Sequence, residues 1–163
     1  SFYLTVSRLK AYKRIDIIVD AFNILGLPLV IIGTGPYLER LRRRAKQNLR
    51  FLTGVEDRAL VSYYHRAKGF VFAGFEDFGL VMAEAQSCGL PVIAYGKGGA
   101  REIVQEPESG ILYGEQCVNS LIAAIKAFEH MTFDPIIVRS CAERFSTESF
   151  KKSITAYVCG SAS

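Results

Sequence analysis

The sequence predicts an α/β fold, namely a Rossmann-like three-layer sandwich built on a parallel six-stranded sheet. Six short apolar runs alternate with segments whose apolar residues recur at helical spacing. Parallel strands need crossover connections, and helices supply these connections on both faces of a sheet. The chain has 163 residues, of which 50% are hydrophobic, and it can therefore bury the core that such a fold requires.

The expected strands are rich in β-branched and aromatic residues, and turn residues bound them. They are residues 2–6, 27–32, 48–52, 69–73, 91–95 and 110–113. A helix is expected over residues 15–25 and others between the later strands, and two more follow the sixth strand, opening at Pro135 and near Ser146. Residues 1–158 would form one domain, and residues 159–163 would form a flexible tail.

Composition narrows the classes of function. The 20 basic and 16 acidic residues leave too small an excess of positive charge to indicate a nucleic-acid partner, whereas a phosphate-bearing small molecule is compatible. No apolar run of about eighteen residues occurs, so no membrane span is expected. The four cysteines form no CxxC pair and the two histidines are isolated, which predicts reduced thiols, a cytoplasmic location and no bound metal or cofactor.

The most informative stretch runs over residues 75–91. It holds Glu76 on a loop and Glu84 on the second turn of the following helix, with seven residues between them. A loop that leaves a parallel strand and enters a helix lies at the ligand-binding edge of the sheet. Glu84 can accept two ribose hydroxyls, and Glu76 can accept hydroxyls further along a ligand. Free amides at the start of the helix favour an anion, and they belong to Phe78, Gly79 and Leu80.

The ends of three other strands should meet at the same edge. Arg8 and Lys13 follow the first strand, where a guanidinium fork and an ammonium suit a diphosphate. Gly33 and Gly35 form a tight turn after the second strand, and the short GxGP pattern favours a structural role for them. Residues 54–57 form the turn after the third strand. The edge as a whole therefore predicts a phosphate site.

These motifs resemble the nucleotide-sugar-binding half of retaining glycosyltransferases with the two-domain GT-B architecture, in particular family 4 (group 1). The resemblance covers almost the whole chain in order. It rests on Ser7-Arg8-Leu9 with Lys13, Gly33-Thr34-Gly35-Pro36, Gly54-Val55, the Glu76 and Glu84 pair with Phe78-Gly79-Leu80 between, and residues 88–93. Residues 76–102 look most like the O-antigen mannosyltransferase branch, which implies GDP-mannose as the donor. Arg14 departs from the family, which usually has glycine there.

The resemblance implies a role for each matching residue. Glu76, Arg8 and Lys13 would be catalytic, with the two cations neutralising the donor diphosphate and Glu76 meeting the transferred sugar. Glu84 would hold the ribose and Val55 would meet the base. The implied donor-binding set is Glu84, Phe78, Gly79, Leu80, Gly33, Gly35, Val55 and Asp57. Independently of the family, the carboxylate of Asp57 suits the paired donors of guanine better than it suits uracil.

The implied reaction is sugar transfer with retention of configuration and without a metal, to a glycan or lipid-linked acceptor in cell-surface polysaccharide synthesis. The family binds its acceptor on an N-terminal domain that this chain does not contain, so we expect donor binding and no transfer by the chain alone. The full-length protein would be cytoplasmic, and action at the inner face of the membrane, through a peripheral contact, stays open.

Several alternatives remain at this point. The donor can be a UDP-sugar instead, and the same edge would also serve a nucleotide-sugar epimerase of the same architecture or a non-catalytic nucleotide-binding module. The pair of glutamates speaks against the epimerase. A dinucleotide oxidoreductase is disfavoured because residues 7–14, SRLKAYKR, lack the glycine fingerprint that lets a pyrophosphate approach the backbone.

Overall fold

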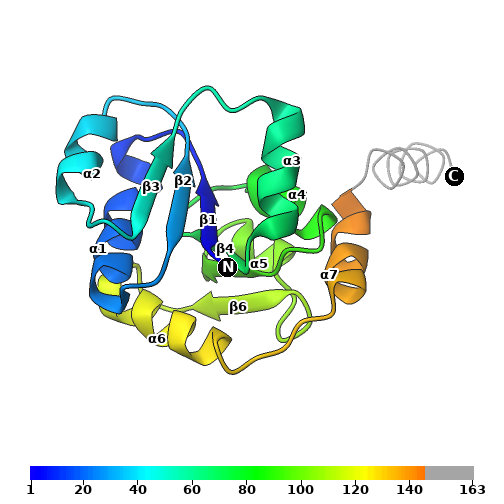
Figure 1. The fold of residues 1–163 in the computed structure, drawn as a ribbon. Helices are drawn as coiled ribbons and strands as arrows, with labels where there is room; N and C mark the ends of the chain where they lie inside the picture. Colours follow the sequence, from blue (N-terminus) through cyan, green and yellow to red (C-terminus); the bar gives the residue numbers. More distant parts are fainter. Residues whose placement is uncertain (146–163) are drawn as a thin grey trace, which may run out of the picture.

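The computed structural model describes residues 1–145 and contains the predicted six-stranded parallel sheet (Figure 1). The strands lie in the order β3-β2-β1-β4-β5-β6, and each neighbouring pair is parallel. They are β1 (Tyr3–Val6), β2 (Leu29–Ile32), β3 (Leu49–Leu52), β4 (Gly69–Phe72), β5 (Val92–Tyr95) and β6 (Gly110–Tyr113). The predicted strands are confirmed, although most begin one or two residues later than expected. The helix expected near Ser146 and the tail at residues 159–163 lie outside the described residues.

Helices cover both faces of the sheet, which makes the three layers (Figure 1). One face carries α1 (Ile15–Leu25), α2 (Leu38–Arg44) and α6 (Val118–Phe128). The other face carries α3 (Asp57–Arg66), α4 (Leu80–Ser87) and α5 (Ala100–Ile103), with α7 (Pro135–Ala142) packed on α4. The single turns η1 (Ala11–Lys13) and η2 (Glu143–Phe145) complete the described elements. Among these elements, no helix combines the length and the apolarity needed to cross a membrane.

The strands explain how one sheet supports two cores. In β2, Leu29 and Ile31 point into the cluster beneath α1 and α6, whereas Val30 and Ile32 point into the cluster beneath α3 and α4. All four side chains are buried, because a parallel strand covered on both faces has no polar side. The alternation follows from the two-residue period of a strand. The core therefore holds the strand ends in fixed positions for the loops that leave them.

The helix boundaries follow ordinary capping chemistry where the sequence supplies it. Pro135 is the first residue of α7, as expected, and the carboxylate of Asp134 accepts a hydrogen bond from the N–H of Ile136 at 2.8 Å. Gly26 ends α1 in the left-handed conformation, with φ 69°. These caps fix where each helix begins and ends relative to the sheet.

The chain reverses the direction in which it adds strands between β1 and β4. From β1 the chain moves outward to β2 and β3, and it then returns to place β4 on the other side of β1. The loops after β1 and β4 therefore leave neighbouring strands and turn to opposite sides, which opens a crevice between them at the carboxyl edge. The segments that carry the predicted site, residues 7–13 and 74–79, lie at this crevice.

Candidate functional site

A cavity of about 720 Å³ occupies the carboxyl edge of the sheet, where the loops after β1, β2, β3 and β4 meet. Eight of the eleven residues predicted for the site line this cavity. They are Arg8, Lys13, Gly33, Val55, Glu76, Phe78, Gly79 and Leu80. Parallel topology thus gathers residues from four separate loops into one place, as the sequence predicts.

The loop after β1 is fastened to the loop after β2. The backbone N–H groups of Ser7 and Leu9 donate to carbonyls of the β2 side at 3.0 and 2.9 Å. A side chain at Gly33 would collide with the carbonyl of Ser7, and one at Gly35 would come within 2.5 Å of the carbonyl of Leu9. Both glycines are therefore required for the close approach of the two backbones, which supports the structural role favoured for them and holds Arg8 at the cavity.

An ion pair between Lys13 and Glu76 joins the loop after β1 to the loop after β4. Both side chains are largely shielded, with exposed fractions of 15% and 22%. Burial, and then the charge of Lys10, lowers the pKa of the Lys13 ammonium, whereas a carboxylate in contact favours the charged form. The ring of Tyr12 lies 4.9 Å from the same ammonium. The cavity therefore holds a poorly hydrated cation beside a carboxylate.

The start of α4 provides hydrogen-bond donors on the opposite wall. Gly79 precedes the helix in the left-handed conformation, with φ 61°, and its position carries no side-chain cap. The amides of Leu80 and Val81 stand in the first turn, where N–H groups have no partner within the helix, and both residues line the cavity. The side chain of Phe78 is 81% exposed at the same place. This geometry suits an anion between the helix start and the two cations.

A glycine loop after β5 supports the Glu76 loop from behind, a role that the sequence did not indicate. The N–H of Gly99 donates to the carbonyl of Glu76 at 2.8 Å. A side chain at Gly99 would lie 2.6 Å from the carbonyl of Asp77, and one at Gly98 would collide with that of Glu76. Lys97, in the same loop, is exposed and does not line the cavity. The glycines matter here for packing between backbones.

Three predicted residues lie outside the cavity lining: Gly35, Glu84 and Asp57. Glu84 is exposed on α4 beside a smaller hollow of about 440 Å³, and its carboxylate accepts from the hydroxyl of Tyr64 at 3.4 Å. Burial, and then the charge of Glu84, raises the pKa of Tyr64. Asp57 is exposed as the first residue of α3. The contacts predicted for Glu84 with ribose and for Asp57 with the base remain predictions.

The structure adds residues that the sequence did not single out. Tyr12, which is 57% exposed, and Asp77 both line the cavity, next to Lys13 and Glu76 in the sequence. Their only sequence signal is that adjacency. Arg14 takes φ 52° and ψ 36°, the left-handed conformation that glycine adopts without cost, so its departure from the family leaves the turn possible. Within residues 1–145, no three His, Cys, Asp or Glu side chains form a group that could hold a metal ion.

Comparisons with known proteins agree with this geometry. The family model described as "Glycosyl transferases group 1" matches residues 1–146. A GDP-mannose-dependent alpha-(1-6)-phosphatidylinositol monomannoside mannosyltransferase of Mycobacterium tuberculosis is 34% identical over 138 residues, which cover 74% of this chain and 36% of that protein. The O-antigen chain mannosyltransferase C of Escherichia coli is 29% identical over 133 residues, which cover 77% and 36%. The chain thus spans only about a third of the length of these curated relatives.

Solved structures share the fold over nearly the whole chain. A lipopolysaccharide outer core galactosyltransferase superposes with a TM-score of 0.86 at 19% identity, over 99% of this chain and 49% of that one. The sucrose-phosphate synthase of Thermosynechococcus elongatus superposes with a TM-score of 0.78 at 26% identity, over 99% and 46%. In both, the matched part is about half of the larger chain.

Replacing Gly99 by Ala should lower the free energy of unfolding by about 1–3 kcal/mol, because the added methyl group would force the backbone of Asp77 to move. Gly114→Ala is the matched control, since its new methyl group meets nothing within 4 Å, and it should change stability by less than about 0.5 kcal/mol. Urea unfolding of both variants measures the difference. Equal stability of the two variants would show that the Glu76 loop does not depend on this packing.

Proposed function

The chain belongs to the glycosyl transferase group 1 family, as its motifs predict, and on that premise we propose that it is the donor-binding domain of a retaining glycosyltransferase. Its ligand would be a nucleotide diphospho-sugar, with GDP-mannose as the first candidate. The observation that carries the proposal is the convergence of Arg8, Lys13, Glu76 and the first amides of α4 on one cavity. Cations and amides suit a diphosphate, and a carboxylate suits sugar hydroxyls.

The proposed chemistry is electrostatic. When the bond between sugar and diphosphate breaks, negative charge grows on the leaving phosphate, and fixed donors that face this charge lower the barrier. Arg8 and Lys13 would face it from the loop after β1, and the amides of Leu80 and Val81 would face it from α4. We propose that these cations and amides stabilise the leaving diphosphate, and that the transfer uses no bound metal or other cofactor.

The contact between Lys13 and Glu76 bears on how a donor would bind. An ammonium carries three N–H donors, so Lys13 can hold a phosphate oxygen and keep one bond to the carboxylate. A donor held in this way would place its second phosphate next to Lys13 and its sugar next to Glu76. The ion pair therefore favours a ligand in which a diphosphate and a sugar are directly joined.

Two relatives favour GDP-mannose as the donor. GDP-mannose appears in the name of the mycobacterial relative, and a mannosyltransferase is also the similar protein of Escherichia coli. The similar sucrose-phosphate synthase is named for another product, so the fold does not by itself select mannose, and a UDP-sugar donor is the alternative. Family membership favours glycosyl transfer over the epimerase alternative.

Calorimetric titration of the chain with GDP, GDP-mannose, UDP, UDP-glucose and NAD should detect binding of a nucleotide-sugar, and Arg8→Ala should weaken that binding by about 10- to 100-fold. The reason is the loss of a charge-assisted hydrogen bond to the diphosphate. Arg43→Ala, on the exposed face of α2, is the matched control and should bind as the wild type does. Unchanged affinity in Arg8→Ala, or no binding of any nucleotide by the wild type, would refute the proposed site.

Asp57→Ala should lower the affinity for GDP by about tenfold and the affinity for UDP by no more than about twofold. The reason is that a carboxylate can accept hydrogen bonds from the paired donors of guanine, whereas uracil lacks this pair. Val55, two residues before Asp57, lines the cavity, which supports the proposal that a base would lie near the start of α3. Glu56→Ala, at the exposed neighbouring position, controls for the local loss of negative charge. An equal loss for both nucleotides would remove this argument for guanine.

Transfer to an acceptor is proposed for the whole protein only, since the chain spans about a third of its relatives. The acceptor would be a glycan or a lipid-linked molecule, met in the cytoplasm at the inner face of the membrane. We expect the isolated chain to bind donor and to transfer no sugar, measured with radiolabelled GDP-mannose and a panel of glycan and polyprenyl acceptors. Steady turnover by the isolated chain would contradict this expectation.

A further inference from the structure

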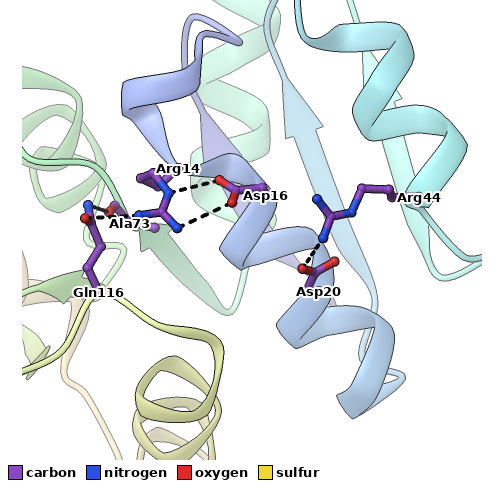
Figure 2. A network of polar contacts seen from close by, with 6 residues as sticks. All are labelled: Arg14, Asp16, Asp20, Arg44, Ala73 and Gln116. Atoms are coloured by element: carbon purple, nitrogen blue, oxygen red, sulfur yellow. Dashed lines mark hydrogen bonds and ion pairs between the residues drawn. The ribbon is translucent and has the colours of Figure 1, made fainter.

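Arg14 and Gln116 form a polar bridge between the two loops that meet at the cavity (Figure 2). The guanidinium of Arg14 donates through Nη1 to the Oε1 atom of Gln116 at 3.3 Å. The Nε2 atom of the same glutamine donates to the carbonyl oxygen of Ala73 at 2.8 Å. Gln116 comes from the connection between β6 and α6, so a third segment of the chain links the loop after β1 to the loop after β4.

The chemistry of the bridge fixes its direction. The amide of Gln116 turns its oxygen toward a guanidinium, which can only donate, and its nitrogen toward a carbonyl, which can only accept. The reverse orientation would set two donors against each other at Arg14 and two acceptors against each other at Ala73. Ala73 is buried, and its carbonyl lies just beyond the end of β4, where Gln116 provides it with a donor.

The two ends of the bridge lie next to the ion pair of the site. Arg14 directly follows Lys13, and Ala73 stands three residues before Glu76. Between them the two backbones lie close together, since a Cβ atom added at Gly74 would be in ordinary van der Waals contact with the Cα atom of Lys13, at 3.5 Å. A change in the separation of Arg14 and Ala73 would therefore act on the neighbouring cation and carboxylate.

We propose that Gln116, together with Arg14, is a positioning residue that sets the spacing between the diphosphate-binding loop after β1 and the sugar-binding loop after β4. The inference rests on the proposed function, and it adds two residues that do not line the cavity. The bridge acts when the donor engages Lys13 and Glu76, because their direct ion pair then shares its groups with the ligand while the bond from Gln116 to Ala73 stays intact.

The ion pair of Arg14 with Asp16 does not set the spacing between the two loops. The Nε and Nη2 atoms of Arg14 donate to Asp16 at 3.3 and 3.4 Å, but the two side chains are 37% and 38% exposed. An exposed pair of this kind holds its partners weakly, and Asp16 lies on α1, immediately after the same loop. Figure 2 shows Arg14 between Asp16 on one side and Gln116 on the other. Among the contacts of Arg14 within residues 1–145, the hydrogen bond to Gln116 is the one that connects it to the β4 side.

The test compares the affinity of the chain for a nucleotide with its affinity for the matching nucleotide-sugar. Gln116→Ala should lower the affinity for GDP-mannose, or for UDP-glucose if the chain prefers it, by about threefold to tenfold. The affinity for the nucleoside diphosphate alone should fall by less than about twofold, because its binding does not require Glu76 to be correctly spaced. Gln116→Glu keeps an acceptor for Arg14 but loses the donor to Ala73, and it should show the same selective loss. Gln47→Ala, on the turn before β3, is the matched control.

Urea unfolding of each variant checks that the fold is retained, and amide hydrogen exchange over residues 74–79 provides a readout that needs no ligand. Faster exchange there in both Gln116 variants, with a selective loss of the nucleotide-sugar, supports the proposal. Equal losses for nucleotide and nucleotide-sugar, or wild-type affinity in Gln116→Ala, would overturn it and leave the donor-binding function standing. If the wild type binds no nucleotide, the proposed function fails, and unchanged exchange in the Gln116 variants would then also exclude the bridge as a link between the loops.

Discussion

The position of β1 between β2 and β4 is the constraint from which the site follows. Because the chain reverses its direction of strand addition there, the loops after β1 and β4 leave adjacent strands and face each other across a crevice. Arg8 and Lys13 are more than sixty residues from Glu76 in the sequence, and the adjacency of these two strands brings them to one cavity. The remaining structure holds the two loops in place: glycines fasten one loop to the β2 side, and the glycine loop after β5 supports the other.

The charges at the cavity are balanced before any ligand is present. Arg8 and Lys13 are opposed by Glu76 and Asp77, and the Lys13 and Glu76 side chains are in contact. A purely basic pocket would attract any phosphate, whereas a balanced one favours a ligand that offers phosphate to the cations and hydroxyls to the carboxylates. The same balance reduces the desolvation cost of keeping Lys13 charged where burial lowers its pKa. A site of this kind would favour a sugar diphosphate over free phosphate without a large excess of positive charge, which agrees with the modest net charge of the chain.

The fold could be predicted from the sequence, and eight of the eleven residues predicted for the site line the cavity, for different reasons. The alternation of buried strands and amphipathic helices is local information, and the parallel order follows from it with few alternatives. Arg8, Lys13 and Glu76 could be placed because the ends of parallel strands share an edge. Side-chain direction is not local information, which is why the contact between Glu84 and Tyr64 of α3 could not be predicted.

Gln116 and Gly99 could not be predicted for a related reason. Their partners are backbone carbonyls of segments far away in the sequence. A sequence pattern does not predict which carbonyl will need a hydrogen-bond donor once the sheet has formed. Such contacts follow from the completed topology of the sheet.

Arg14 illustrates how a departure from a family pattern can be compensated. A non-glycine residue in the left-handed conformation costs about 1 kcal/mol relative to glycine. Glycine at this position would remove that cost but would also remove the guanidinium that binds Gln116 and Asp16. One hydrogen bond to a charged donor contributes on the order of 1.5 kcal/mol, which is enough to offset the backbone strain. The arginine therefore retains the turn that a glycine would form and adds a connection between the two loops of the site.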